Sequence, residues 1–303
     1  MYPAITFVIV THNRRACLDR AICSIRAFCP GETEIVVVDN ASTDDTWAWL
    51  QQQARIVSVR APSNFGPGPG RNLGIAQAVG ELIFFLDDDA YLDGEILGAG
   101  LDCLRADSTI GCVAYPIWEV SLQRLLYGGR PGSVKCFAAG GALFRKSVLE
   151  SIGGFDEGIR WSEEFDLSVR LYAAGYRIVG LSGPLIHHHA ATSTTHHSGQ
   201  KLRAIAGGRL RSFMTHFRWP AAMIFSGRML LSVGWVGLKG GHFWPVPLAV
   251  WDIFRSWSAI RRRRVVVPKN VQELFFRPDP AEDEFSVPIT SKVMRRLFKD
   301  QKL

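Results

Sequence analysis

The sequence predicts an α/β protein with a mostly parallel central sheet flanked by helices, followed by a basic, helical C-terminal extension. Three observations lead to this prediction. Strand and helix signals alternate over the first 115 residues, polar side chains follow each predicted strand, and the pattern beyond residue 200 is helical and rich in arginine. Alternating strands and helices form right-handed crossover units, which make parallel sheets. Such sheets bind ligands beyond the carboxyl ends of their strands.

Four apolar, β-branched runs predict the strands of this sheet, over residues 5–11, 33–40, 54–61 and 81–89. Apolar residues at helical spacing predict helices over 14–28, 44–54 and 70–80, with Ser42 or Thr43 as the cap of the second helix. Residues 112–190 have a mixed α/β pattern. We therefore expect one domain over 1–198, divided into halves at 1–111 and 112–198, and a basic helical region over 199–303.

Charge is segregated along the chain. Residues 1–200 hold 16 Lys and Arg against 21 Asp and Glu, whereas residues 201–303 hold 19 against 7. A basic tail suits nucleic acid, anionic lipid or a phosphorylated substrate, and its charge alone does not choose between them. Since no motif that reads nucleic acid accompanies the tail, we do not expect a nucleic acid partner. The segment "RRRR" (261–264) and nearby aromatic residues suit phosphate or lipid headgroups, with solvated surface charge as the alternative.

The cysteines and the hydrophobic segments suggest a location. None of the six cysteines forms a C-x-x-C pair, so we expect no zinc ribbon, and reduced thiols in a cytoplasmic compartment. The first residues predict a strand, and no signal peptide is expected. The most hydrophobic C-terminal stretch, 223–244, is interrupted by Arg228 and Lys239. We expect it to fall short of the ~20 apolar residues that span a membrane.

Three consecutive carboxylates, Asp87, Asp88 and Asp89, follow the fourth predicted strand in "FFLDDDAYLD". Carboxylates so close together repel each other, and a divalent cation would relieve that repulsion. Mg²⁺ and Mn²⁺ prefer oxygen ligands and often join carboxylates to substrate phosphates. The spacing of an EF-hand calcium loop is not met. A solvated acidic turn is the alternative interpretation.

The glycine-rich segment "SNFGPGPGRNLG" (63–74) does not match the dinucleotide-binding pattern G-x-G-x-x-G, so a nicotinamide enzyme is not expected. We interpret it as a loop that lets backbone approach a ligand, with Arg71 offering a guanidinium to phosphate or base. An ordinary connecting loop is the alternative.

Two later segments carry further candidate side chains. In "WSEEFDLSVRLYAAGYRI" (161–178), acidic residues would stand in the first turn of a helix, and Asp166 would pair with Arg170 four residues on. This structural explanation accounts for the carboxylates without a catalytic role. In "LIHHHAATSTTHH" (185–197), neighbouring residues of a strand point to opposite faces. At most one or two of these histidines can therefore share a site.

Together these segments resemble family 2 glycosyltransferases of the GT-A fold, a Rossmann-like α/β fold, and particularly the bacterial rhamnosyltransferase-like branch. The resemblance covers roughly residues 4–195. Its segments stand in the family's order: "VIVTHNR", "VVVDNASTDDT", "SNFGPGPGRNLGI", "FFLDDDAYL", "GGALFRKSVLESIGGFDE", "SEEFDLSVRLYAAGYRI" and a following histidine.

The resemblance implies a role for each half of the domain, the first binding a nucleotide sugar and the second carrying the catalytic and acceptor groups. The implied nucleotide-sugar residues are Thr11, Asn13, Asp39, Asn64, Arg71, Asp87 and Asp88. Asp87 and Asp89 match the D-x-D motif and, with His188, would hold Mn²⁺ or Mg²⁺; His187 is the alternative register. The implied acceptor side is formed by Gly140, Gly141 and Trp161.

The implied general base is Glu164, at a position where the family usually has an aspartate, and Asp166 is the alternative base. The resemblance thus implies a metal-dependent, inverting transfer from a UDP- or dTDP-sugar, with rhamnose as one candidate. The acceptor would be a hydroxyl of a growing cell-surface glycan or of a lipid-linked acceptor, reached from the cytoplasm with peripheral contact to the inner membrane. The alternative is a catalytically silent, sugar-nucleotide-binding subunit of a polysaccharide assembly complex.

Overall fold

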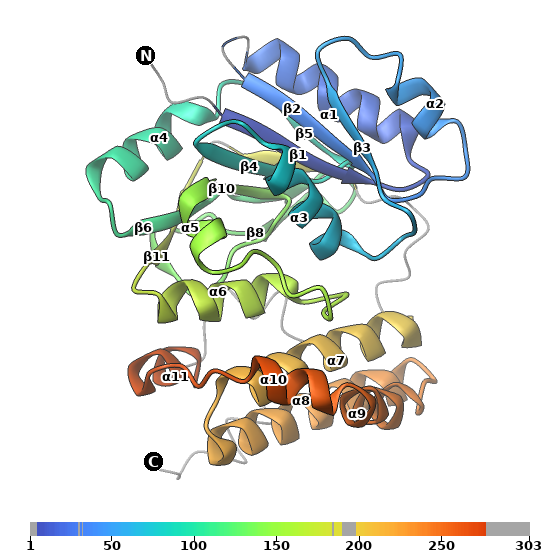
Figure 1. Ribbon diagram of the computed structural model, residues 1–303, viewed down its shortest axis with the longest axis vertical. Helices are drawn as coiled ribbons and strands as arrows, with labels where there is room; N and C mark the ends of the chain where they lie inside the picture. Colours follow the sequence, from blue (N-terminus) through green and yellow to red (C-terminus); the bar gives the residue numbers. More distant parts are fainter. Residues whose placement is uncertain (1–4, 30, 32, 184, 190–197, 277–303) are drawn as a thin grey trace. The chain divides into compact units, whose positions relative to one another are not determined.

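The computed structural model describes residues 5–29, 31, 33–183, 185–189 and 198–276. The chain forms two compact units, residues 1–192 and 193–303 (Figure 1). Each unit is described by itself below. The division after residue 198 that the sequence suggests stays a prediction.

Unit 1 is built on an eight-stranded sheet with the order β3-β2-β1-β4-β10-β6-β11-β9. Its first four strands are parallel: β3 (Val57–Arg60), β2 (Thr33–Asp39), β1 (Ile5–Thr11) and β4 (Leu82–Leu86). The others are β10 (Gly141–Arg145), β6 (Ile110–Ala114), β11 (Arg177–Gly180) and β9 (Gly132–Val134). β10 is antiparallel to both of its neighbours, and β9 is antiparallel to β11. The parallel half predicted from the sequence is confirmed, and the sheet as a whole is mixed.

Helices flank this sheet (Figure 1). They are α1 (Arg15–Phe28), α2 (Thr46–Leu50), α3 (Pro67–Gln77), α4 (Leu97–Ala106), α5 (Lys146–Ser151) and α6 (Glu163–Ala173). α2 is shorter than the predicted 44–54, and neither Ser42 nor Thr43 caps it; Asp45 stands at the cap position without a side-chain bond. The Ser42 hydroxyl instead accepts a hydrogen bond from the Asn13 backbone N–H.

The glycine-rich segment is a loop only up to Gly66, because α3 begins at Pro67, three residues earlier than the predicted helix; its approach to a ligand stays a prediction. Pro67 stands at the beginning of the helix, where the missing N–H of proline costs no hydrogen bond. A Cβ at Gly70 would lie 2.7 Å from Val10 Cγ1, and one at Gly74 would lie 2.3 Å from Val8 Cγ1. These glycines let the helix pack closely on β1.

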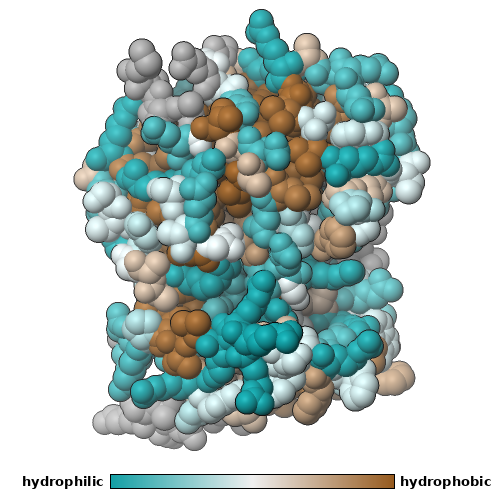
Figure 2. Space-filling model, in the orientation of Figure 1, coloured by the Kyte–Doolittle hydropathy of each residue, from teal (hydrophilic) through white to brown (hydrophobic). Residues whose placement is uncertain are grey.

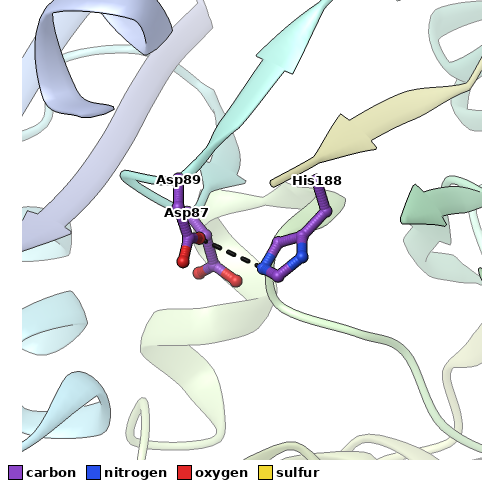
Figure 3. A group of neighbouring side chains, drawn as sticks. All are labelled: Asp87, Asp89 and His188. Carbon is purple, nitrogen blue, oxygen red and sulfur yellow. Dashed lines mark ion pairs between the residues drawn. The ribbon is translucent and has the colours of Figure 1, made fainter. Parts of the chain in front are cut away.

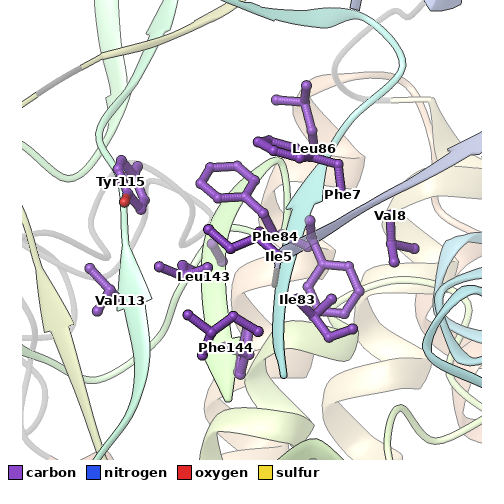
Figure 4. Packing of buried hydrophobic residues seen from close by; sticks show 14 of the residues in the cluster. Ile5, Phe7, Val8, Ile83, Phe84, Leu86, Val113, Tyr115, Leu143 and Phe144 are labelled. Atoms are coloured by element: carbon purple, nitrogen blue, oxygen red, sulfur yellow. The ribbon is translucent and has the colours of Figure 1, made fainter. Parts of the chain in front are cut away.

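Aromatic side chains fill the core between β1, β4 and β10 (Figure 4). Phe84 is fully buried, and its ring centroid lies 5.0 Å from that of Phe7 and 5.1 Å from that of Tyr115. Truncation of one such phenylalanine to alanine typically costs about 3–5 kcal/mol of stability. β4, which leads into the three aspartates, is therefore firmly held.

A second, four-stranded sheet has the order β5-β12-β7-β8. Its strands are β5 (Ala90–Leu92), β12 (Ile186–His188), β7 (Ile117–Glu119) and β8 (Arg124–Tyr127). The register places His188 beside Ala90 and Glu119, and His187 beside Tyr91 and Trp118. Because side chains alternate along a strand, the two histidines point to opposite faces.

Unit 2 is helical over its described residues: α7 (Gly199–His216), α8 (Trp219–Lys239), α9 (Pro245–Arg255), α10 (Trp257–Arg263) and α11 (Lys269–Phe276). A small apolar cluster of α7, α8 and α9 residues holds it together. α8 is, by length and composition, long and apolar enough to cross a membrane, which by itself is weak support for a membrane location. The expectation that this stretch is too short was wrong, because Arg228 and Lys239 leave the helix predominantly apolar.

Candidate active site

The carboxyl ends of β1, β2 and β3 lie in register, and their loops are tied together by side-chain amides. Asn13 Oδ1 accepts a hydrogen bond of 2.7 Å from the Thr43 backbone N–H. Asn64 Oδ1 accepts one of 3.1 Å from Asn40 Nδ2. Of the predicted nucleotide residues, Asn13 and Asn64 thus brace the loops at this edge of the sheet.

Asp39, at the end of β2, is fully buried. Both of its carboxylate oxygens lie 3.2 Å from the Ser42 backbone N–H, and Oδ2 lies 3.5 Å from Arg60 Nε. The Arg60 guanidinium also stacks over the Trp47 ring, 5.3 Å from its centroid. These contacts fix the turn that follows β2.

Asp88 and Asp89 share an ion pair with one arginine, Arg14, for which the sequence predicts no role. Arg14 Nη1 donates to Asp88 Oδ1 at 3.0 Å and to Asp89 Oδ2 at 2.8 Å. Asp88 is buried and also accepts a 2.8 Å hydrogen bond from Thr11 Oγ1. Burial raises the pKa of Asp88 to about 6, although Arg14 opposes this effect.

Asp87 is paired with Arg71, which links it to helix α6. Arg71 Nη2 donates to Asp87 Oδ1 at 3.0 Å, and Nη1 donates to Glu163 Oε1 at 2.7 Å. Arg71 and Glu163 are both buried, whereas the Asp87 side chain is 37% exposed. Burial and then the charge of Glu164 raise the pKa of Glu163 to about 8, against the attraction of Arg71.

His188 stands between two carboxylates (Figure 3). Its Nε2 lies 3.1 Å from Asp89 Oδ1, and its Nδ1 lies 2.6 Å from Glu119 Oε2. Burial by itself would lower the pKa of His188, but Asp89, Glu119 and the charge of Asp87 together raise it to about 9. The cross-strand neighbour Glu119 thus fixes the orientation of the imidazole.

Asp87, Asp89 and His188 form a group that fits a divalent cation. Each offers one ligand atom, and these atoms lie within 4.8 Å of one another. Figure 3 shows the two carboxylates and the imidazole pointing toward one another. His187 does not join them, because its Nε2 faces Asp93 at 3.7 Å. The register places His188, and not the alternative His187, at this group.

The two candidate bases differ in their surroundings. Asp166 is 1% exposed and accepts a 2.8 Å hydrogen bond from Arg170 Nε, which confirms the predicted pair within the helix. Glu164 is partly exposed in the first turn of α6, and its charge acts on both Arg71 and Glu163. Glu164 is therefore the more accessible carboxylate of the two.

Close packing explains the glycines expected on the acceptor side. A Cβ at Gly140 would lie 2.5 Å from Asp87 Oδ2, and one at Gly141 would lie 2.9 Å from Ile186 Cγ1. Gly140 therefore leaves room for the Asp87 carboxylate. Trp161 is 41% exposed and precedes α6 by one residue, Ser162, whose φ is +68°.

The sequence matches the profiles of two related families. The profile of "Glycosyl transferase family 2" matches residues 6–153, and that of "Glycosyl transferase family group 2" matches residues 125–254. This chain belongs to glycosyltransferase family 2. The first match contains the D-x-D aspartates, and the second contains Glu164 and His188.

Among the curated relatives of this family member, the O-antigen chain rhamnosyltransferase WbaN of Salmonella anatum is 23% identical over 61% of this chain and 66% of its own length. The uncharacterized glycosyltransferase alr2836 of Nostoc sp. is 40% identical, and the match covers 52% of this chain and 55% of that protein. A GalNAc(5)-diNAcBac-PP-undecaprenol β-1,3-glucosyltransferase of Campylobacter jejuni is 33% identical over 36% of each chain. The chain thus spans less than two thirds of the length of these relatives.

Solved structures show that this chain has the GT-A fold. The mannosyltransferase PcManGT from Pyrobaculum calidifontis, in complex with GDP-Man and Mn²⁺, has a TM-score of 0.62 at 17% identity, covering 99% of this chain and 89% of that one. S. aureus TarS 1–349 in complex with UDP-GlcNAc has a TM-score of 0.57 at 18% identity. The match covers 76% of this chain and 72% of that one.

For three residues of the site, Arg14, Glu119 and Glu163, the sequence predicted no role in the site. Arg14 directly follows the polar end of β1, and a cation beside an acidic site could have been sought there. Glu119 is buried and reaches His188 only through strand pairing across 69 positions of the sequence. Glu163 was seen as part of an acidic first turn, and its partner Arg71 lies 92 positions away.

Proposed function

We propose that this chain transfers a sugar from a nucleotide-diphosphate donor, a UDP- or dTDP-sugar, to a hydroxyl of a cell-surface glycan or lipid-linked acceptor, with inversion at the anomeric carbon. The observation that carries this proposal is the convergence of Asp87, Asp89 and His188, with ligand atoms within 4.8 Å, at the end of β4. Relatives whose names include an O-antigen rhamnosyltransferase and an undecaprenol-linked glucosyltransferase support the class of acceptor.

Asp87, Asp89 and His188 would hold Mn²⁺ or Mg²⁺. When bound, this cation would supply positive charge to the departing diphosphate. Arg71 holds Asp87 in place from a buried position, and Glu119 does the same for His188. Arg14 contacts both Asp88 and Asp89 and so offsets part of the repulsion among the three aspartates. We assign Thr11, Asn13, Asp39 and Asn64 to the support of the nucleotide pocket.

Glu164 would act as the general base. Its carboxylate would take the proton of the acceptor hydroxyl while that oxygen bonds to the anomeric carbon, and the bond from this carbon to the diphosphate oxygen would break on the opposite face. The proton ends on Glu164, and the electron pair ends on the nucleoside diphosphate. Asp166 suits this role less, because it is buried against Arg170.

We place the reaction on the cytoplasmic side of the membrane. All six cysteines are unpaired in the structure, as suits a reducing compartment. Gly140, Gly141 and Trp161 remain the proposed acceptor side, with Trp161 the most exposed of the three.

Calorimetric titration with UDP-, dTDP- and GDP-sugars, each with and without Mn²⁺, tests the donor. We expect one nucleotide class to bind tightly and only with the metal. Asp89→Asn should abolish metal-dependent binding, whereas Asp93→Asn, at an aspartate that is 69% exposed, should not. If none of these sugars binds the wild type, the proposal is wrong.

Turnover is tested by the release of free nucleoside diphosphate, followed by chromatography. Glu164→Gln should bind the donor normally and release at least about a hundredfold less product, since general base catalysis contributes ~10²–10⁴-fold. A normal rate would move the base elsewhere. Tight donor binding with no turnover in the wild type and a panel of lipid-linked acceptors would favour the silent-subunit alternative.

A further inference from the structure

Helix α8 presents several large apolar side chains to the outside. Its exposed residues up to Leu238, apart from Pro220 in the first turn, form what we call the apolar stripe: Trp219, Met223, Gly227, Leu231, Trp235 and Leu238. They recur every four residues, or three at the last step, so they share one face of the helix. The five with side chains are 44–65% exposed.

The face of α8 that packs on unit 2 combines small residues with larger apolar ones, since Met229, Leu230 and Val236 pack against the apolar cluster of α7, α8 and α9. Ala222, Ser226, Ser232, Val233 and Gly237 are buried against the rest of unit 2. A helix at the surface of a protein in water has polar side chains on the face away from the core, whereas α8 is apolar on that face as well. The apolar stripe is thus suited to a non-aqueous environment.

Positive charge borders the apolar stripe. The Arg264 guanidinium lies 4.0 Å from the Trp219 ring centroid, and Lys239 Nζ lies 5.1 Å from that of Trp235. Arg261 and Arg262 are exposed at the end of α10. Figure 2 shows hydrophilic and hydrophobic side chains next to each other over the segments that Figure 1 draws in orange and red.

Acidic residues are scarce in this part of the chain. Residues 199–276 hold 13 Lys and Arg against two acids, Asp252 and Glu273. Both acids are ion-paired, Asp252 with Arg203 at 2.6 Å and Glu273 with Lys269 at 3.5 Å. A second copy of this unit would bring the same positive charge to the interface and be repelled. An anionic surface would be attracted.

We propose that the apolar stripe docks on the surface of a bilayer that contains anionic lipid, with α8 lying in the plane of the headgroups. Tryptophan next to lysine or arginine is typical of the membrane–water interface. The stripe runs along the whole helix and the other face is buried in protein, so the helix is placed to lie on the membrane and not to cross it. This inference is independent of the proposed sugar transfer, because it rests on unit 2 alone.

Flotation of the full chain with vesicles tests the proposal. We expect binding to vesicles of phosphatidylcholine with 30–40% phosphatidylglycerol, weak binding to pure phosphatidylcholine, and loss of binding as salt is raised. The double variant Leu231→Glu, Trp235→Glu should lower the affinity by at least about tenfold. Val79→Glu is the matched control, since Val79 is an apolar residue of unit 1 that is 77% exposed, and it should bind as wild type.

The arginines are tested separately by Arg261→Gln, Arg262→Gln, which should weaken binding to anionic vesicles by roughly fivefold for each arginine. Circular dichroism establishes that each variant is folded. If the glutamate variant is unfolded, Leu231→Ser, Trp235→Ser replaces it.

Two results would overturn the proposal. One is wild-type protein that does not float with anionic vesicles at low salt, or that floats equally well with the stripe substituted. The other is a wild-type dimer in sedimentation that the stripe variant turns into a monomer without any effect on vesicle binding. Donor binding measured on the same samples reports on unit 1, so failure of the transferase proposal would be seen separately.

Discussion

The affinity of the acidic group for Mn²⁺ should increase about fiftyfold between pH 7 and pH 9. His188 is held between Asp89 and Glu119, and these contacts raise its pKa to about 9 in the metal-free protein. An imidazole must lose its proton before its nitrogen can bind a cation. At pH 7 about one molecule in a hundred has a neutral His188, and at pH 9 about half do. The difference corresponds to about 2.3 kcal/mol of binding free energy.

Calorimetry in oxygen-free buffers measures this effect. Titration with Mn²⁺ in two buffers of different ionisation enthalpy gives the number of protons released, which should be about one at pH 7 and about half at pH 9. His188→Gln should remove the proton release and most of the pH dependence. His187→Gln is the matched control, because His187 is its neighbour on β12 and points to the opposite face.

One result would refute this reasoning. If the wild type binds Mn²⁺ with the same affinity at both pH values and releases no proton, His188 is not a ligand. A pH dependence that is unchanged in His188→Gln would assign the proton to another group. Glu163, whose pKa is raised to about 8 and whose partner Arg71 also contacts Asp87, would be examined next.

Further predictions concern stability and the close contacts of the site. In the metal-free protein, the charged form of His188 contributes stability that is fully present below about pH 6.5 and is lost as the pH rises through 9. The melting temperature of the wild type should therefore fall between these pH values, and that of His188→Gln should not. Glu119→Gln should weaken Mn²⁺ binding by about 10–100-fold in calorimetry, and an unchanged affinity would exclude its positioning role. Gly140→Ala puts a methyl group 2.5 Å from a carboxylate oxygen of the metal group, so metal binding should weaken while the urea midpoint stays the same. Gly74→Ala puts one 2.3 Å from a core valine of β1 and should cost about 1–3 kcal/mol in urea unfolding; Gly207→Ala, with open space around it, should cost nothing.

Much of the first half of the fold follows from local patterns. The runs of β-branched residues at 5–11 and 33–40 correspond to β1 and β2, because buried parallel strands need apolar side chains on both faces. The position of the three aspartates at the end of β4 could be predicted for the same reason. The need for glycine at positions 70 and 74 has no local signal, because it arises from the close contact of α3 with β1.

The sequence by itself determined the alternation of strands and helices, the family, and the aspartates of the metal group, since these depend on residue types and short spacings. Tertiary structure alone decided which groups face each other. The register of β12 against β7 selects His188 over His187 and gives it Glu119 as a partner. The folding of β1 next to β4 brings Arg14 to Asp89, 75 positions away. Contacts over such separations depend on strand pairing and packing, which leave no local signal in the sequence.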